Sequence, residues 1–210
     1  MELKYDDRGQ IASTGNLNED LYSHLQKLNY YQQDSPKSLG IEWVNDQIHP
    51  ILKKFNNLPI NPKEKDDLLN EFPEIKGKKV LTIPGRVTKW KGVSEFIELI
   101  SLLDNNYHGL VVGPIAKSKK SYFKKLLSKV SSLNLDHKIT FTGSRTDITN
   151  IYKISDIVYN LSQTPEPFGR TMIEAIACGT KVIAWNHGGA SEILKKLFPQ
   201  GLVDLDEMGK

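Results

Sequence analysis

The chain has 210 residues, of which 39% are hydrophobic and 25% are charged, and its formal net charge is +3. This balance is typical of a globular protein with one medium domain or two small ones. The apolar runs are too short to cross a bilayer. The polar N-terminus MELKYDDRGQ has no hydrophobic leader core, and the single Cys178 cannot form an internal disulfide. Both features predict a cytoplasmic protein.

The first 75 residues divide into two segments. Residues 1–55 predict a small, mainly helical segment, because NEDLYSHLQKL and IEWVNDQIHPILKKF carry apolar residues at helical spacing. The stretch NNLPINPKEKDD contains prolines and mixed charges, which favour a loop. We therefore expect a linker over residues 56–75.

Apolar runs alternate with helical patterns from Lys78 onward. The expected strands are KKVLTIPG, HGLVVGP, KITFTG, IVYNLS, KVIAWN and GLVD, and the expected helices are GVSEFIELISLL, SKKSYFKKLLSKVSSLN, TDITNIYKIS, GRTMIEAIACG and GASEILKKLF. Uniformly apolar strands separated by helices are typical of a parallel sheet that is buried on both faces. We predict an α/β fold for residues 76–210, a Rossmann-like, doubly wound parallel sheet. Ligands bind such sheets beyond the carboxyl ends of the strands.

Basic and glycine residues follow the first and fifth expected strands. GRVTKWKG places Arg86 and Lys91 after Gly85. Arg offers phosphate a planar fork and Lys offers it a point charge, so this segment is either a diphosphate site or a solvated basic turn. The pair Gly188–Gly189 begins an expected helix, where unpaired N–H groups attract anions. Gly169 precedes another helix in the same way.

Two glutamates, Glu166 and Glu174, stand with seven residues between them, the first in a Pro-rich turn and the second on an expected helix. One interpretation is an i,i+4 ion pair between Arg170 and Glu174 with an exposed Glu166. A second is a carboxylate pair of the glycosidase type. A third has both carboxylates accept from sugar and ribose hydroxyls, facing a diphosphate held by Arg86 and Lys91. We prefer the third, because it alone uses the cations and the carboxylates together.

Other residue patterns carry weaker signals. A solvated helix face, or a basic surface toward a membrane or nucleic acid, would explain the lysines at 117, 119, 120, 124, 125 and 129. No aromatic pattern accompanies them, so we expect no nucleic acid, and peripheral membrane contact stays an alternative. Cys178 is expected in the core. His108, His137 and His187 lack metal-ligand spacing, so no metal is expected.

The segments GRVTKWKG, FTG followed by Arg145, and PEPFGRTMIEAIACGTKVIAWNHGGASEIL resemble, in this order, the C-terminal domain of glycosyltransferase family 4. The resemblance covers residues from about 60 to 204. It implies one half of the GT-B architecture, in which two Rossmann-like domains enclose the active site. It also implies sugar transfer from a nucleotide-diphosphate donor with retention, without a metal or other cofactor.

The resemblance also implies residue roles. Arg86 and Lys91 would stabilise the leaving diphosphate, Glu166 would hold the donor sugar's hydroxyls, and Glu174 would accept from the ribose. The remaining implied donor contacts are Gly85, Gly143, Arg145, Phe168, Gly169, Arg170, Gly188 and Gly189. The family continues beyond LVDLDEMGK and has a second, acceptor-binding domain, so we expect the activity of this chain to depend on a separate domain or chain.

Residues from about 3 to 55 resemble an internal stretch of anhydro-N-acetylmuramic acid kinases, on YDDRGQIASTGNLNEDLYSHL and PKSLGIEWV. The Gly/Ser/Thr-rich opening loop of those kinases is absent. We therefore expect a kinase-like fragment fused to the transferase domain rather than kinase activity. A non-catalytic interaction module is the third alternative.

Overall fold

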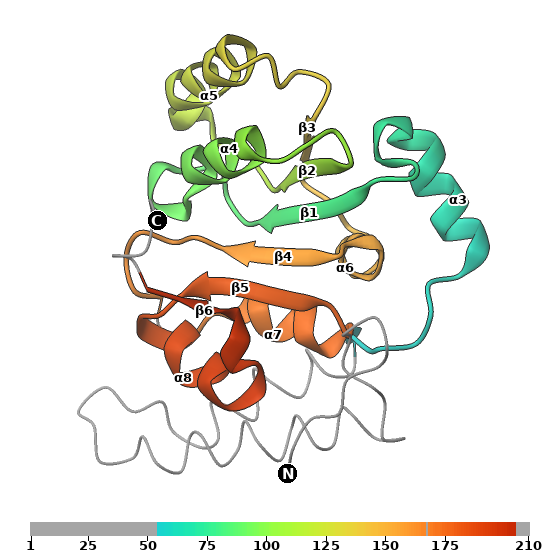
Figure 1. Ribbon diagram of the computed structural model, residues 1–210, viewed down its shortest axis with the longest axis vertical. Helices are drawn as coiled ribbons and strands as arrows, with labels where there is room; N and C mark the ends of the chain where they lie inside the picture. Colours follow the sequence, from blue (N-terminus) through green and yellow to red (C-terminus); the bar gives the residue numbers. More distant parts are fainter. Residues whose placement is uncertain (1–53, 167, 205–210) are drawn as a thin grey trace.

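The computed structural model describes residues 54–166 and 168–204. The helical segment expected in residues 1–55, with its kinase resemblance, lies outside the described residues apart from Lys54 and Phe55. The described chain builds a parallel sheet with helices on both faces (Figure 1).

Six strands form the sheet, in the order β3-β2-β1-β4-β5-β6, and every neighbouring pair is parallel. The strands are β1 (Lys79–Pro84), β2 (Tyr107–Val112), β3 (Ile139–Gly143), β4 (Ile157–Asn160), β5 (Lys181–Trp185) and β6 (Leu202–Val203). Their carboxyl ends point to the left in Figure 1. This topology confirms the predicted Rossmann-like α/β fold. Successive strands are added on one side of β1 up to β3 and on its other side from β4 onward, so the order of the strands reverses between β1 and β4.

Helices α4 (Val93–Leu102) and α5 (Lys120–Ser132) cover one face of the sheet. Successive side chains of a strand point to opposite faces, and Leu81 and Ile83 of β1 point toward these helices. They are buried against Phe96 of α4 and Leu126 of α5. The lysines at 117, 119, 120, 124 and 125 stay exposed on the outer side, as a solvated helix face would.

The opposite face is covered by α6 (Ile148–Ile154), α7 (Arg170–Ala177) and α8 (Gly188–Leu197). These helices bury a cluster that includes Val158 of β4 and Val182 of β5. Short 3-10 turns complete the connections: η1 (Pro73–Ile75), η2 (Lys89–Lys91), η3 (Lys117–Lys119) and η4 (Pro199–Gly201).

The expected linker is wrong over its second part, because helix α3 (Pro62–Glu71) lies there. The Asn61 side chain accepts from the Lys63 N–H at 2.9 Å, and Pro62 occupies the first turn. These features mark the start of a helix, although proline and mixed charge are also common in loops. Leu68 and Phe72 pack against Val80 and Leu110 of the sheet, so this segment belongs to the core. The other domain bounds stay predictions.

Candidate functional site

The loops that follow β1 and β4 meet at the carboxyl ends of the strands, where the strand order reverses. The Gln163 N–H of the second loop donates to the Trp90 carbonyl of the first at 2.7 Å. Gly92 has φ +75, and a Cβ there would lie 2.1 Å from the Leu161 carbonyl oxygen. Only glycine permits this approach. The fold thus joins the two loops at the point where this class of sheet binds ligands.

Lys91 and Glu166 form an ion pair between these two loops. The Lys91 Nζ lies 2.5 Å from the Glu166 Oε1, and the side chains are 14% and 15% exposed. The Ser162 Oγ also donates to Oε1. Among the described residues, the hydrogen bonds to this carboxylate end on Oε1 and not on the second oxygen, Oε2. The Lys91 ammonium also lies 4.4 Å from the centroid of the Trp90 ring, which adds a cation–π contact.

The loop before α8 closes against the same glutamate. The Gly189 N–H donates to the Glu166 carbonyl at 2.8 Å. Gly188 has φ +55, and a Cβ there would lie 2.9 Å from that carbonyl oxygen, so glycine is again required. The His187 Nε2 meets the Ser162 carbonyl at 3.0 Å, so this nitrogen carries the proton. Three loops from β1, β4 and β5 therefore converge on Glu166.

Arg86 is a second cation at this edge. It is exposed, and no residue of the described chain pairs with it. Gly85, just before it, has φ +128, and a Cβ there would lie 3.7 Å from the stem of Lys91. The structure therefore places Gly85, Arg86, Lys91, Glu166 and the Gly188–Gly189 pair at one edge of the sheet, and their contact with a ligand stays a prediction.

Glu174 lies in a different environment, buried in α7. Its Oε1 accepts from the Arg170 Nε at 2.8 Å, and its Oε2 accepts from the Tyr152 hydroxyl at 3.0 Å. The predicted i,i+4 ion pair is therefore present. Burial, and then the nearby carboxylate, raises the pKa of Tyr152 well above its ordinary value, so the phenol stays a donor. A ribose contact of Glu174 stays a prediction, and it would have to share oxygens that are already bonded.

Arg145, the predicted neighbour of the nucleotide base, is held by two carboxylates. Its Nε and Nη2 each lie 2.8 Å from Asp147 oxygens, and its guanidinium forms a fork with Glu71 of α3. It also lies over the Phe72 ring, 5.3 Å from the centroid. Hydrogen bonds from the guanidinium hold the pKa of Asp147 below its ordinary value. The side chain therefore fastens α3 to the loop after β3, and a donor contact from this loop stays a prediction.

The other predicted donor contacts surround this site at loop ends. Gly143 ends β3 with φ +71, and its carbonyl accepts from the Gly113 N–H at 2.9 Å. Gly169 caps α7 with φ +60, and Phe168 packs against the core. Arg170 has a side chain that is 62% exposed. These residues lie at the carboxyl edge, and their contact with a ligand stays a prediction.

Sequence reasoning missed two residues that shape the site. Trp90 lies in the short turn η2, where no periodic pattern marks a functional side chain. Tyr152 lies on α6 and reaches Glu174 across 22 residues of sequence.

Residues 54–166 and 168–204 contain no cluster of His, Cys, Asp and Glu side chains that could hold a metal ion. The helices in these same ranges include none with the length and apolar character needed to cross a membrane. Cys178 is buried, and burial raises the pKa of its thiol to about 12. This agrees with the predicted core role, because the thiol is not reactive at neutral pH.

This Rossmann-like domain carries cations and a carboxylate at the point where its strand order reverses. It therefore belongs to the class of α/β proteins that bind ligands at this point. Residues 64–204 match the family Glycosyl transferases group 1, and the chain belongs to this family of glycosyltransferases. Mannosylfructose-phosphate synthase of Agrobacterium fabrum is 34% identical over 153 residues. The match covers 68% of this chain and 33% of that protein, so the chain spans about a third of the relative's length.

Solved structures give the same result. The crystal structure of Anabaena HepE in complex with UDP-glucose is 30% identical with a TM-score of 0.60, and the match covers 64% of this chain and 36% of that one. The C-terminal domain of a group 1 glycosyl transferase (LpcC) from Francisella tularensis is 27% identical with a TM-score of 0.56. That match covers 73% of this chain and 78% of the crystallised domain.

Proposed function

We propose that this domain binds a nucleotide-diphosphate sugar at the carboxyl edge of the sheet and supplies the donor half of a retaining glycosyltransferase. The contact between Lys91 and Glu166 carries the proposal, because it unites a cation and a carboxylate from loops 75 residues apart. A diphosphate sugar needs both groups, since its phosphates are anionic and its sugar offers hydroxyl donors. The UDP-glucose complex of HepE supports the same ligand class.

Each group has a distinct chemical task in this proposal. Arg86 and Lys91 stabilise the negative charge that develops on the leaving diphosphate. Glu166 accepts from the sugar hydroxyls through Oε2. Glu174 accepts from the ribose, and the loop from Gly143 to Arg145 borders the base. Donor contacts also come from the turn at 168–170 and the start of α8.

The two glutamates are poorly placed for a glycosidase. Such enzymes need two carboxyl groups that flank one glycosidic bond. Here Glu166 faces Lys91, while Glu174 faces Arg170 and Tyr152. Each carboxylate thus faces its own donors rather than the other carboxylate. This arrangement supports a role in binding a ligand rather than a role as a general acid/base pair.

The acceptor belongs to a separate part of the enzyme in this proposal. The chain covers 33% of the Agrobacterium relative and 36% of the HepE chain. We propose that transfer requires a second Rossmann-like domain or chain that binds the acceptor, while donor binding does not. The kinase resemblance of residues 3–55 stays a prediction.

A thermal-shift panel of UDP, GDP, ADP and ATP tests the donor site. A nucleotide at about a hundred times its dissociation constant stabilises the fold by about 2.7 kcal/mol. We expect one nucleoside diphosphate to raise the melting temperature, and Arg86→Ala to remove this shift. Arg86 suits the test because it is exposed. Lys124→Ala, which removes an exposed cation from α5, is the matched control. A flat panel, or equal losses in both variants, contradicts the proposal.

A further inference from the structure

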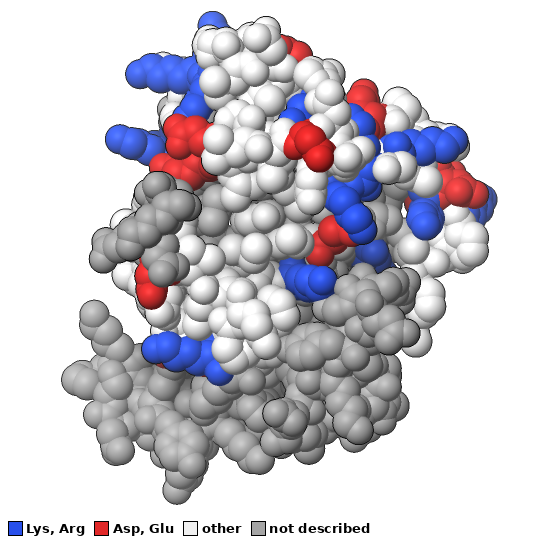
Figure 2. Space-filling view, in the orientation of Figure 1, with Lys and Arg blue, Asp and Glu red and all other residues white. Residues whose placement is uncertain are grey.

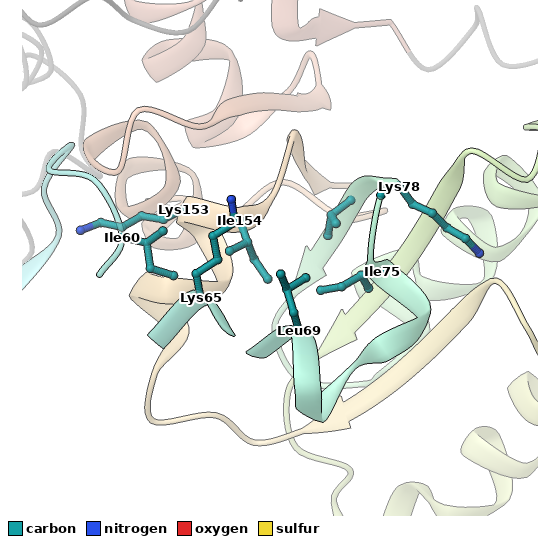
Figure 3. Close-up of a pocket in the computed structure, with 9 residues that line it drawn as sticks. Ile60, Lys65, Leu69, Ile75, Lys78, Lys153 and Ile154 are labelled. Atoms are coloured by element: carbon teal, nitrogen blue, oxygen red, sulfur yellow. The ribbon is translucent and has the colours of Figure 1, made fainter. Parts of the chain in front are cut away.

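A cavity of about 310 Å³ opens at the amino ends of the strands, at the opposite end of the sheet from the donor site (Figure 3). Lys78 and Val80 border it from the start of β1, Ile154 from the end of α6, and Lys65 from α3. Strand β1 spans six residues, so about 20 Å of sheet separates this cavity from the loop after β1. A ligand here would not touch Lys91 or Glu166.

The cavity has an apolar floor. Ile75 and Val80 are 2% and 4% exposed, and Ile60, Leu69 and Ile154 are the other apolar side chains of the lining. These side chains come from α3 and the segment before it, η1, β1 and α6, so the floor is assembled only in the folded chain. A volume near the lower end of the usual range for small-molecule sites suits a small ligand with an apolar body.

Three lysines give the cavity its charge. Lys65, Lys78 and Lys153 line it together with no acidic residue. The Lys153 Nζ meets the neutral Asn56 Oδ1 at 3.2 Å, and none of the three lysines forms an ion pair with a described residue. Figure 3 shows Lys78 and Lys153 extending outward in opposite directions, away from the other lining residues, with Lys65 between them.

The surrounding surface differs from the cavity. Figure 2 shows Lys and Arg side chains on the right, over α3 and the amino ends of the strands, with acidic side chains among them. A mixed surface of this kind has no preference for an ion of one sign. The cavity does favour an anion, because the polar side chains that line it are all lysines. The apolar floor disfavours a small hydrated ion, and the lysines repel a cationic ligand.

We propose that this cavity binds a small amphiphilic anion, an apolar chain or ring that ends in a phosphate or a carboxylate. The apolar body packs on Leu69, Ile75 and Ile154, and the anionic end reaches the ammonium group of Lys65 or of Lys153. This site is separate from the donor site, so it does not depend on the proposed nucleotide-sugar binding.

Isothermal titration of decyl phosphate into the full chain, below its micelle-forming concentration, tests the proposal. We expect saturable binding, with decanol and inorganic phosphate each weaker by about tenfold or more, because each lacks one half of the recognition. Anionic phospholipid vesicles provide the second source of the same chemistry. Binding to vesicles without binding of monomeric decyl phosphate would show that the protein surface, and not the cavity, attracts the anion. This result would overturn the proposal.

Two kinds of variant separate the cavity from bulk charge. Lys65→Glu should weaken the affinity for decyl phosphate by about tenfold or more. Lys63→Glu, on the same helix but outside the lining, should change this affinity by less than about twofold. Leu69→Trp fills the cavity without changing charge and should also abolish binding, with circular dichroism confirming the fold. Equal weakening by the two charge variants, or full binding in Leu69→Trp, would overturn the proposal.

Discussion

Replacing Glu166 with glutamine should tighten the binding of a nucleoside diphosphate. In the ligand-free protein the Lys91 ammonium is bonded to the Glu166 carboxylate at 2.5 Å, so a diphosphate must compete with that carboxylate for its cation. The variant Glu166→Gln keeps the size of the side chain and one acceptor oxygen, but it replaces the second oxygen with a donor amide and removes the charge. In this variant the side chain at position 166 competes less with the diphosphate for Lys91, and it no longer repels the diphosphate.

The burial of the pair sets the magnitude. Both side chains are only 14–15% exposed, so water screens the pair less than a surface ion pair. Exposed pairs contribute up to about 1 kcal/mol, and hydrogen bonds to charged groups contribute about 1.5–3 kcal/mol. We take about 1.4 kcal/mol as the part that depends on the Glu166 charge, which is about a tenfold change in affinity. A nucleotide sugar loses its hydroxyl contact in the same variant, so its affinity should not rise.

Isothermal titration of UDP and UDP-glucose, or of whichever nucleotide pair the thermal panel identifies, measures this effect. The expected result is about tenfold tighter diphosphate binding, with the preference for the nucleotide sugar lowered by at least as much. Glu64→Gln, an exposed charge on α3, controls for net charge. Unchanged or weaker diphosphate binding in Glu166→Gln would refute the competition, and no binding in any variant would refute the donor site itself.

Three further predictions concern the fold. His108 is buried with its Nδ1 unpaired in the described chain, and burial, followed by the charge of Lys78, lowers its pKa from 6.5 to about 4. The unfolded chain therefore binds this proton first, and stability should fall as pH drops below 6.5, by about 1 to 2 kcal/mol near pH 5. Urea unfolding of His108→Gln should show a smaller fall, and an equal fall would contradict this account. Gly92→Ala should cost about 3 kcal/mol or more, because the new Cβ would lie 2.1 Å from the Leu161 carbonyl; a melting temperature like that of the parent would contradict it. Phe72→Ala should cost about 3 kcal/mol in the same assay, because it opens a cavity beneath Arg145; a loss below about 1 kcal/mol would mean that α3 is not part of the core.

Much of the fold was predictable because its strands are apolar throughout. β1, with the pattern KVLTIP, is buried from its second residue to its last, so the hydrophobic run alone marks it. The α3 helix could not be found in this way, because its prolines and charges resemble a loop and only Leu68 is fully buried within it. Its evidence is the contact of Leu68 and Phe72 with distant strands.

The candidate site was predictable only in outline. Arg86, Lys91 and Glu166 could be placed at one sheet edge, because parallel strands bring their carboxyl ends together. The direct bond between Lys91 and Glu166 depends on how closely the two loops approach, which Gly92 sets. The pairing of Arg145 with Glu71 was also beyond sequence reasoning, since it depends on a helix that was expected to be a linker.

Amide chemical-shift mapping of the isotope-labelled chain during titration with UDP-glucose tests the central claim most directly. The account predicts that shifts concentrate in the loops 85–92, 161–166 and 186–189, at the carboxyl edge, while Lys65 and Leu69 at the amino edge do not respond. Shifts that centre on the amino edge, or no saturable shifts at all, would contradict a donor site built around Lys91 and Glu166.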